Sequence, residues 1–276
     1  MDNLPLLAGM LALSGFVWFS WRYAWWRPSV DEIHPRILMY HMIRDAVPGA
    51  RFNGMRVSPA LFDKQVAYLK ENGWHFYTVS ELIEQWDMLP PKSVGITFDD
   101  GYADNVEQAL PILKKHGAKG TVYLVVDRHQ TEWSVNKKKK HDSGELKREP
   151  KLKDSQVMEL IESGVIEIAS HTMTHPNFAD ISTETKRKEL TQSKNMLEAR
   201  FGIEIKTFAY PFGILKEEDS DLVQEAGYMG AVTTVSGIDQ RQPFNPFLLK
   251  RLKISGKEGM LAFKLRLRSG MRGANK

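Results

Sequence analysis

The chain has 276 residues, of which 42% are hydrophobic and 26% are charged, and its formal net charge is +4. These values are ordinary for a globular protein, and the length fits one α/β domain with appendages. The charge is too small to indicate nucleic-acid binding, although basic residues gather at 137–140 and after Lys250. No cysteine is present, so a disulfide framework and a thiolate metal site are excluded, and a transition metal would need His, Asp or Glu.

The N-terminal region contains an uncharged apolar run at 4–21. Its length is close to the roughly 20 residues that cross a bilayer, and tryptophans and Arg22 lie at its end like an interfacial belt. We therefore expect residues 1–27 to form a transmembrane helix that anchors the protein, with a linker at 28–35. A cleaved signal peptide fits less well, because a basic leading region and a small-residue cleavage site are missing. A buried core helix is the remaining alternative.

From residue 36 onward, short apolar runs alternate with helical patterns. The predicted strands are 36–40, 76–79, 93–98, 121–126, 165–169, 207–210 and 230–234. The predicted helices are 59–71, 81–86, 105–116, 154–163, 183–201 and 216–226, most of them followed by glycine. This alternation predicts a parallel sheet, open or closed into a barrel. Residues 130–153 are polar and basic, and we interpret them as an insertion or a mobile loop.

Two adjacent acids, Asp99 and Asp100, directly follow the predicted buried strand at 93–98. Active sites of parallel α/β sheets lie at the carboxyl ends of the strands, so both acids are candidate functional residues. Buried carboxylates are costly unless something pairs them. A metal ion would pair one of them and leave the other free to act as a base.

Two histidines, His171 and His175, follow the strand predicted at 165–169. On a helical turn their spacing places both imidazoles on one face, where they can hold one metal ion. Two histidines and one carboxylate make a metal site with open positions for water. Such histidine pairs often occur by chance, but the acid pair after another strand favours a shared metal site.

A third segment at 208–213 ends a predicted strand with a Pro and Gly turn between aromatic residues, which alone is a weak signal. Together, TFDDG at 97–101, SHTMTH at 170–175 and AYPFG at 209–213 resemble the three motifs of the polysaccharide deacetylases of the NodB homology group, carbohydrate esterase family four. Their order and separation are also similar. The resemblance covers roughly residues 36–254.

The resemblance implies a distorted (β/α) barrel of the NodB type at 36–255, preceded by the transmembrane helix and followed by a basic C-terminal tail at 256–276. It also implies a metal centre within the barrel. Asp100, His171 and His175 would bind a divalent metal, usually zinc, and Asp99 would be the general base.

The third motif implies contacts with substrate and also departs from the family. Tyr210 and Phe212 would wall the sugar site, and a backbone N–H at the Phe212 turn would bind the oxyanion. Ala209 stands where many members carry an arginine that holds the catalytic aspartate. In addition, no histidine follows His175, although many members supply the catalytic acid from a C-terminal histidine.

We expect His41 to supply that acid, because it directly follows the first predicted strand of the barrel. This arrangement resembles the branch of the family that deacetylates poly-N-acetylglucosamine in biofilm export, where the strand bearing the acid comes before TFDDG. A histidine with a structural role at the end of a strand is the alternative.

The resemblance therefore predicts metal-dependent hydrolysis of N-acetyl groups from an N-acetylglucosamine-type polysaccharide, with release of acetate. A deacetylase or deformylase of a lipid-linked amino sugar at the membrane is an alternative that the predicted anchor and basic tail favour. A non-catalytic carbohydrate-binding or assembly protein is the alternative of another class. The expected partners are an N-acetylated polysaccharide or lipid-linked glycan and the membrane, without nucleic acid.

We expect a single-pass protein of the cell (inner) membrane. Counting the positive charges beside the apolar run places the catalytic domain in the cytoplasm. The chemistry that the resemblance implies favours the extracytoplasmic side, so both orientations remain open.

Overall fold

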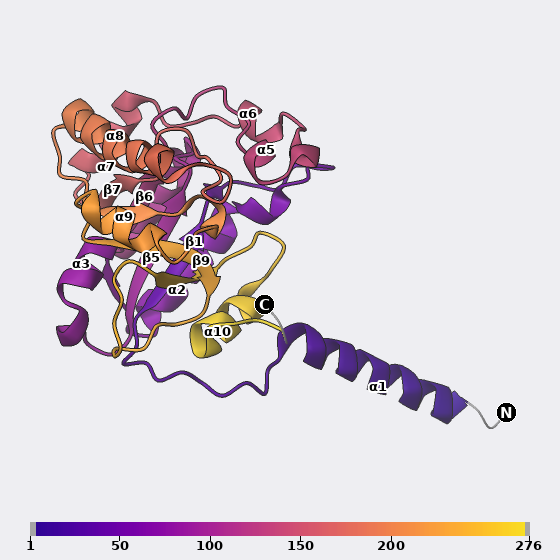
Figure 1. Ribbon diagram of the computed structural model, residues 1–276. Coiled ribbons are helices and arrows are strands. Elements are labelled where there is room, and N and C mark those ends of the chain that lie inside the picture. The colour runs from indigo at the N-terminus through magenta and orange to yellow at the C-terminus, as the bar shows by residue number, and fades with distance from the viewer. Residues whose placement is uncertain (1–3, 274–276) are drawn as a thin grey trace.

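The computed structural model describes residues 4–273, the side chains of residues 4–7 and 140 aside (Figure 1). Its strands are β1 Arg36–Tyr40, β2 Met42–Ile43, β3 Arg56–Val57, β4 His75–Tyr77, β5 Ser93–Asp99, β6 Gly120–Leu124, β7 Ile166–Ser170, β8 Thr207–Ala209, β9 Gly230–Ser236 and β10 Leu249–Lys253. Its α-helices are α1 Leu4–Tyr23, α2 Pro59–Glu71, α3 Val79–Glu84, α4 Leu110–His116, α5 Ser134–Lys137, α6 Glu145–Arg148, α7 Asp154–Glu162, α8 Thr183–Phe201, α9 Asp219–Glu225 and α10 Met260–Ser269.

A parallel barrel forms the centre of the molecule. Strands β5 to β10 follow one another in chain order, β10 pairs with β1, and β1 pairs back with β5, which closes the ring. The short strand β4 pairs beside the first half of β5. The barrel prediction is thus confirmed, and the closing strand β10 is an addition to the strands predicted from sequence.

Alternate residues of each strand face opposite sides of the barrel wall. Leu38 and Ile96 belong to the larger core cluster, which also contains helix residues such as Phe62 of α2. Ile37 and Leu249 belong to a second, smaller cluster. Side chains that alternate in step with Ile37 and Leu249 therefore point into the barrel. Those near its carboxyl end can line an active site.

The N-terminal helix α1 extends away from the rest of the chain (Figure 1). Across the part of the chain that the structure describes, no helix combines the length and the apolar character needed to cross a membrane. The prediction of a transmembrane anchor and of single-pass placement in the inner membrane is therefore wrong. Polar and charged residues, Ser14, Ser20 and Arg22, lie within this helix and lower its hydrophobicity.

The basic C-terminal residues include helix α10, whose Phe263 and Leu267 are buried in the main core cluster. Arg36, at the start of β1 and 1% exposed, holds this region to the chain before the barrel. Its guanidinium donates to the carbonyl of Leu267 at 3.0 Å and to that of Val30 at 2.7 Å. The domain boundaries drawn from the sequence stay a prediction.

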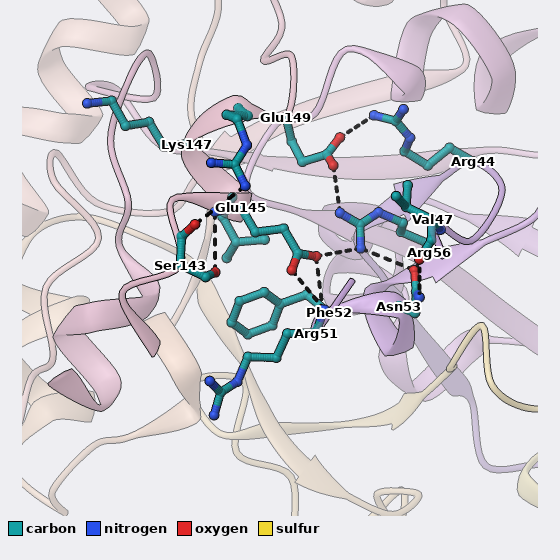
Figure 2. Close-up of polar contacts among 12 residues, drawn as sticks. Arg44, Val47, Arg51, Phe52, Asn53, Arg56, Ser143, Glu145, Lys147 and Glu149 are labelled. Carbon is teal, nitrogen blue, oxygen red and sulfur yellow. Dashed lines mark hydrogen bonds and ion pairs between the residues drawn. The ribbon is translucent and has the colours of Figure 1, made fainter. Parts of the chain in front are cut away.

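The segment 130–153, interpreted from the sequence as an insertion or mobile loop, contains α5 and α6 and is tied to the loop that follows β2 (Figure 2). Arg56, whose side chain is 1% exposed, lies between two carboxylates, 2.7 Å from Glu145 and 2.6 Å from Glu149. Glu145 also accepts the backbone N–H groups of Arg51 at 2.8 Å and Phe52 at 3.1 Å. A single buried guanidinium thus fastens two distant segments together.

Replacing Arg56 by methionine should strongly destabilise the protein, because both glutamates would lose their buried partner. Breaking a buried pair typically costs about 3–5 kcal/mol, and urea denaturation at pH 7 measures the loss. Arg44→Met is the matched control: Arg44 also contacts Glu149, but its side chain is 37% exposed, so a loss under about 1 kcal/mol is expected. Equal effects of the two substitutions would show that burial does not govern this cluster.

Candidate active site

A cavity of about 320 Å³ opens at the carboxyl end of the barrel. Residues at or after the ends of β1, β5, β7, β8, β9 and β10 line it, and the segment 130–153 forms one of its walls. The lining side chains from the strand ends are His41, Asp99, Asp100, His171, His175, Phe212, Thr234 and Lys253. This is the position at which parallel α/β barrels place their active sites.

Asp100, His171 and His175 converge on one point of this cavity and form a possible metal site. The Asp100 Oδ1 atom is 3.5 Å from His171 Nε2 and 3.4 Å from His175 Nε2, and the two Nε2 atoms are 3.2 Å apart. Ligand atoms around a tetrahedral ion with bonds of about 2.0–2.1 Å lie roughly 3.3–3.4 Å apart. The donor set and its spacing therefore fit a divalent cation such as zinc.

The backbone around these ligands is irregular rather than helical. The helical turn expected at His171 and His175 is wrong, because the segment is a loop in which Thr172 has φ +73° and His175 has φ +55°. Asp100, directly after β5, has φ +77°. Positive φ costs a non-glycine residue about 1–3 kcal/mol and tends to be retained at functional sites.

Contacts from outside the cavity hold the histidine loop in this conformation. Glu189 of α8 accepts the backbone N–H of Met173 at 2.8 Å and of Thr174 at 3.0 Å, and also the Thr174 hydroxyl at 2.8 Å. Within the loop, the Thr172 hydroxyl accepts the N–H of His175 at 2.9 Å. Glu189 is thus a positioning residue that the sequence did not reveal.

The environment of both imidazoles suits metal ligation. His171 Nδ1 is 2.7 Å from the Ala209 carbonyl oxygen, so this nitrogen carries the proton and Nε2 faces the site with its lone pair. Burial, and secondarily the neighbouring His171, lowers the pKa of His175 to about 3, which keeps that imidazole uncharged. The ring of His175 is held between Trp133 and Phe212, with ring centroids 5.2 and 4.4 Å away.

Asp99, the other member of the acid pair, is held by Arg251 of β10. The two guanidinium nitrogens lie 2.7 and 2.8 Å from the two carboxylate oxygens, and Arg251 is 0% exposed. Arg251 also donates to the Thr97 hydroxyl and to the Thr233 carbonyl, which fixes the plane of its guanidinium. Burial alone would raise the pKa of Asp99, but the charge and hydrogen bonds of Arg251 outweigh it and lower that pKa.

This pair accounts for the missing arginine of the third motif, because another strand supplies one. Arg251 lies two residues after Leu249, which belongs to the smaller, inward-facing cluster. Alternation along β10 would have indicated that Arg251 also points into the barrel. Its partner, 152 residues away in the chain, could not be read from the sequence.

The remaining predicted site residues are placed differently from one another. His41 is partly buried and lines the cavity, and burial lowers its pKa despite the nearby carboxylates of Asp100 and Asp99. Phe212 has φ +59° and also lines the cavity. Tyr210 does not wall the cavity: it is 0% exposed in the main core cluster, and its hydroxyl donates to the Phe247 carbonyl.

The segment 130–153 contributes a wall that the sequence did not predict. Trp133, Lys137, Lys138, His141 and Leu146 from this segment line the cavity. The buried Lys151 supports it from behind, with its ammonium 5.0 Å from the ring centroid of Trp133. The insertion is therefore part of the candidate site.

Comparison with known proteins agrees with this geometry. A sequence model described as polysaccharide deacetylase matches residues 87–231, more than half of the chain. The chain belongs to the polysaccharide deacetylase family. As predicted from the three motifs, it is therefore related to hydrolases that act on an amide bond.

Relatives of this deacetylase are found among bacterial proteins. The Bacillus subtilis protein YxkH, named for the same family, is 30% identical over 222 residues, which are 79% of this chain and 71% of YxkH. The poly-β-1,6-N-acetyl-D-glucosamine N-deacetylase of Staphylococcus aureus is 26% identical over 181 residues, which are 62% of this chain and 58% of that enzyme. The structure of the Streptococcus pyogenes deacetylase PplD in complex with acetate has a TM-score of 0.69 at 26% identity and covers 87% of this chain and 98% of PplD.

Replacing Arg251 by methionine should raise the pKa of Asp99, because burial would then act without an opposing charge. Asp99 must be ionised to accept a proton, so acetate release from an N-acetylated oligosaccharide should fall more steeply at pH 5 than at pH 8. We expect a loss of at least about 100-fold in kcat/KM at pH 6. Arg251→Lys keeps the charge but not the two parallel hydrogen bonds, so its kcat/KM at pH 6 should lie between those of the wild type and of Arg251→Met. An unchanged pH profile in folded Arg251→Met would contradict this role.

Proposed function

We propose that this polysaccharide deacetylase hydrolyses N-acetyl groups from an N-acetylglucosamine-type glycan and releases acetate. The observation that carries this proposal is the convergence of Asp100, His171 and His175 next to the Asp99–Arg251 pair in one cavity. The name of the Staphylococcus aureus relative supports the substrate class, and the acetate bound to PplD is the product that such a reaction releases.

A divalent cation, which we propose is zinc, would be held by Asp100, His171 and His175. When bound there, it would supply Lewis-acid activation of water and of the acetamide carbonyl. The three donor atoms are buried and lie about one tetrahedral edge apart, which suits this ion.

Asp99 is the group that takes a proton from the attacking water. Both of its oxygens are bound by Arg251, which keeps the carboxylate ionised across the neutral range and fixes its direction. The lowered pKa makes Asp99 a weak base, so Asp99 does not retain the proton and transfers it to the group that protonates the leaving amine.

His41 delivers a proton to the leaving amine, which is otherwise a very poor leaving group. Because burial lowers its pKa, His41 rests uncharged at neutral pH and receives this proton within the catalytic cycle. A backbone N–H of the Phe212 turn, which lines the same cavity, would stabilise the oxyanion, a contribution of about 3–4 kcal/mol for a well-placed donor.

Asp100→Ala should lose bound metal and acetate release together, whereas Asp99→Asn should lose activity and keep its metal. The reason is that only Asp100 offers an oxygen to the ligand cluster. Metal analysis of purified protein and acetate release from an N-acetylglucosamine tetramer, with chelation and zinc add-back, measure both. His75→Gln, at the exposed first position of strand β4, is the control and should change neither. Wild-type protein that binds metal and glycan but releases no acetate would show a binding protein instead of an enzyme.

His41→Gln should reduce kcat by about 10²–10⁴-fold, the usual contribution of a positioned proton donor. Its metal content and thermal stability should match those of the wild type, because the His41 side chain is not one of the clustered ligands. Turnover of this variant at the wild-type rate would remove His41 from the mechanism.

A further inference from the structure

Three lysines line the same cavity as the candidate metal site. Lys137 and Lys138 come from the end of α5, and Lys253 is the last residue of β10, so two separate walls contribute positive charge. All three side chains are exposed to solvent at the cavity. The Lys137 ammonium lies 5.6 Å from the ring centroid of Phe212, the aromatic residue that also contacts His175.

These lysines have no acidic partner among the residues that the structure describes. Other lysines of the chain do pair, including Lys250 on the same strand, which lies 3.6 Å from Asp239. Desolvation at the cavity wall, together with the positive charges of Lys253 and Lys138, lowers the pKa of Lys137. The ammonium of Lys137 is thus near enough to the other two to be repelled by both.

The carboxylates of the cavity do not balance this charge. Asp99 and Asp100 are the acids among its lining residues. Arg251 already neutralises Asp99 through two short hydrogen bonds. Asp100 belongs to the candidate metal site, where a divalent cation would more than offset it. The lysines therefore leave a positive potential at the cavity, and a low-dielectric cleft focuses such a potential on the ligand.

A positive cavity discriminates between classes of glycan. Removal of an acetyl group from an amino sugar leaves an ammonium, so a glycan that already carries free amines would be repelled. A neutral glycan gains no charge–charge attraction from the lysines. An anionic group is attracted, and a lysine ammonium binds phosphate or carboxylate as a point charge.

We propose that the substrate of this deacetylase carries an anionic group, a phosphate or a carboxylate, on or next to the N-acetylated sugar, where Lys137, Lys138 and Lys253 bind it. This inference rests on the proposed deacetylase function and specifies its substrate class. The lysines act on substrate selection and leave the hydrolytic step to the residues around the metal site.

The test compares four tetrasaccharides: a neutral N-acetylglucosamine tetramer, the same tetramer carrying a phosphate, a tetramer alternating with a uronic acid, and a partly deacetylated tetramer. At low salt, wild-type kcat/KM should be highest for an anionic tetramer and lowest for the cationic one. The difference should shrink at about 0.5 M salt, because screening weakens interactions between exposed charges. The phosphate and uronate arms show which anion is preferred.

The double variant Lys137→Gln/Lys253→Gln should lower kcat/KM for the preferred anionic tetramer about tenfold and for the neutral tetramer less than about twofold. Lys139→Gln is the matched control, because Lys139 belongs to the same basic run but does not line the cavity. Calorimetric binding of the anionic tetramer to metal-free protein gives a second readout that needs no turnover, and it should weaken in the double variant alone.

A preference for the neutral or cationic tetramer, or equal losses on all four in the double variant, would overturn the proposal while leaving the deacetylase function intact. Absence of acetate release from every tetramer by zinc-loaded wild-type protein would instead count against the proposed function. The binding readout would then still decide whether the lysines select an anion.

Discussion

The close approach of three metal-ligating atoms at the carboxyl end of the barrel is the constraint on which the rest of the site depends. Two imidazole nitrogens and one carboxylate oxygen lie 3.2–3.5 Å from one another in a buried position. One shared cation would be coordinated by all three atoms at once. Keeping these atoms together requires positive φ angles at Asp100 and His175. The Glu189 carboxylate accepts three hydrogen bonds from the histidine loop and holds the loop in this conformation.

Much of the barrel and of the ligand set could be predicted because both are local in the sequence. Asp99 and Asp100 directly follow the buried run at 93–98, so they lie at the carboxyl end of its strand. The conformation of the histidine loop could not be predicted in this way, because spacing alone does not distinguish a helical turn from a loop with Thr172 in a left-handed conformation. The prediction that Tyr210 walls the sugar site is wrong because side chains alternate along a strand. Ala209 belongs to the smaller, inward-facing cluster, so Tyr210 points the other way, into the main core cluster.

The ion pairs between residues far apart in the chain could not be predicted from the sequence. Arg251 and Asp99 form one of the most buried ion pairs of the described chain, yet neither residue indicates the other in the linear order. The same holds for Arg56 and its two glutamates (Figure 2). They tie the polar, lysine-rich segment 130–153, which lines the cavity, to the loop after β2. In both cases a guanidinium with several donors joins segments that pattern analysis treats separately.

The closure of the barrel also has a consequence for synthesis of the protein. Strand β1, which precedes His41, pairs with β10, which carries Arg251, so the first and last strands of the ring are neighbours. A nascent chain that has emerged only through β9 contains Asp100, His171 and His175 but lacks Arg251, the guanidinium that orients Asp99. The site can therefore be completed only after β10 has been synthesised and pairs with β1 to close the barrel.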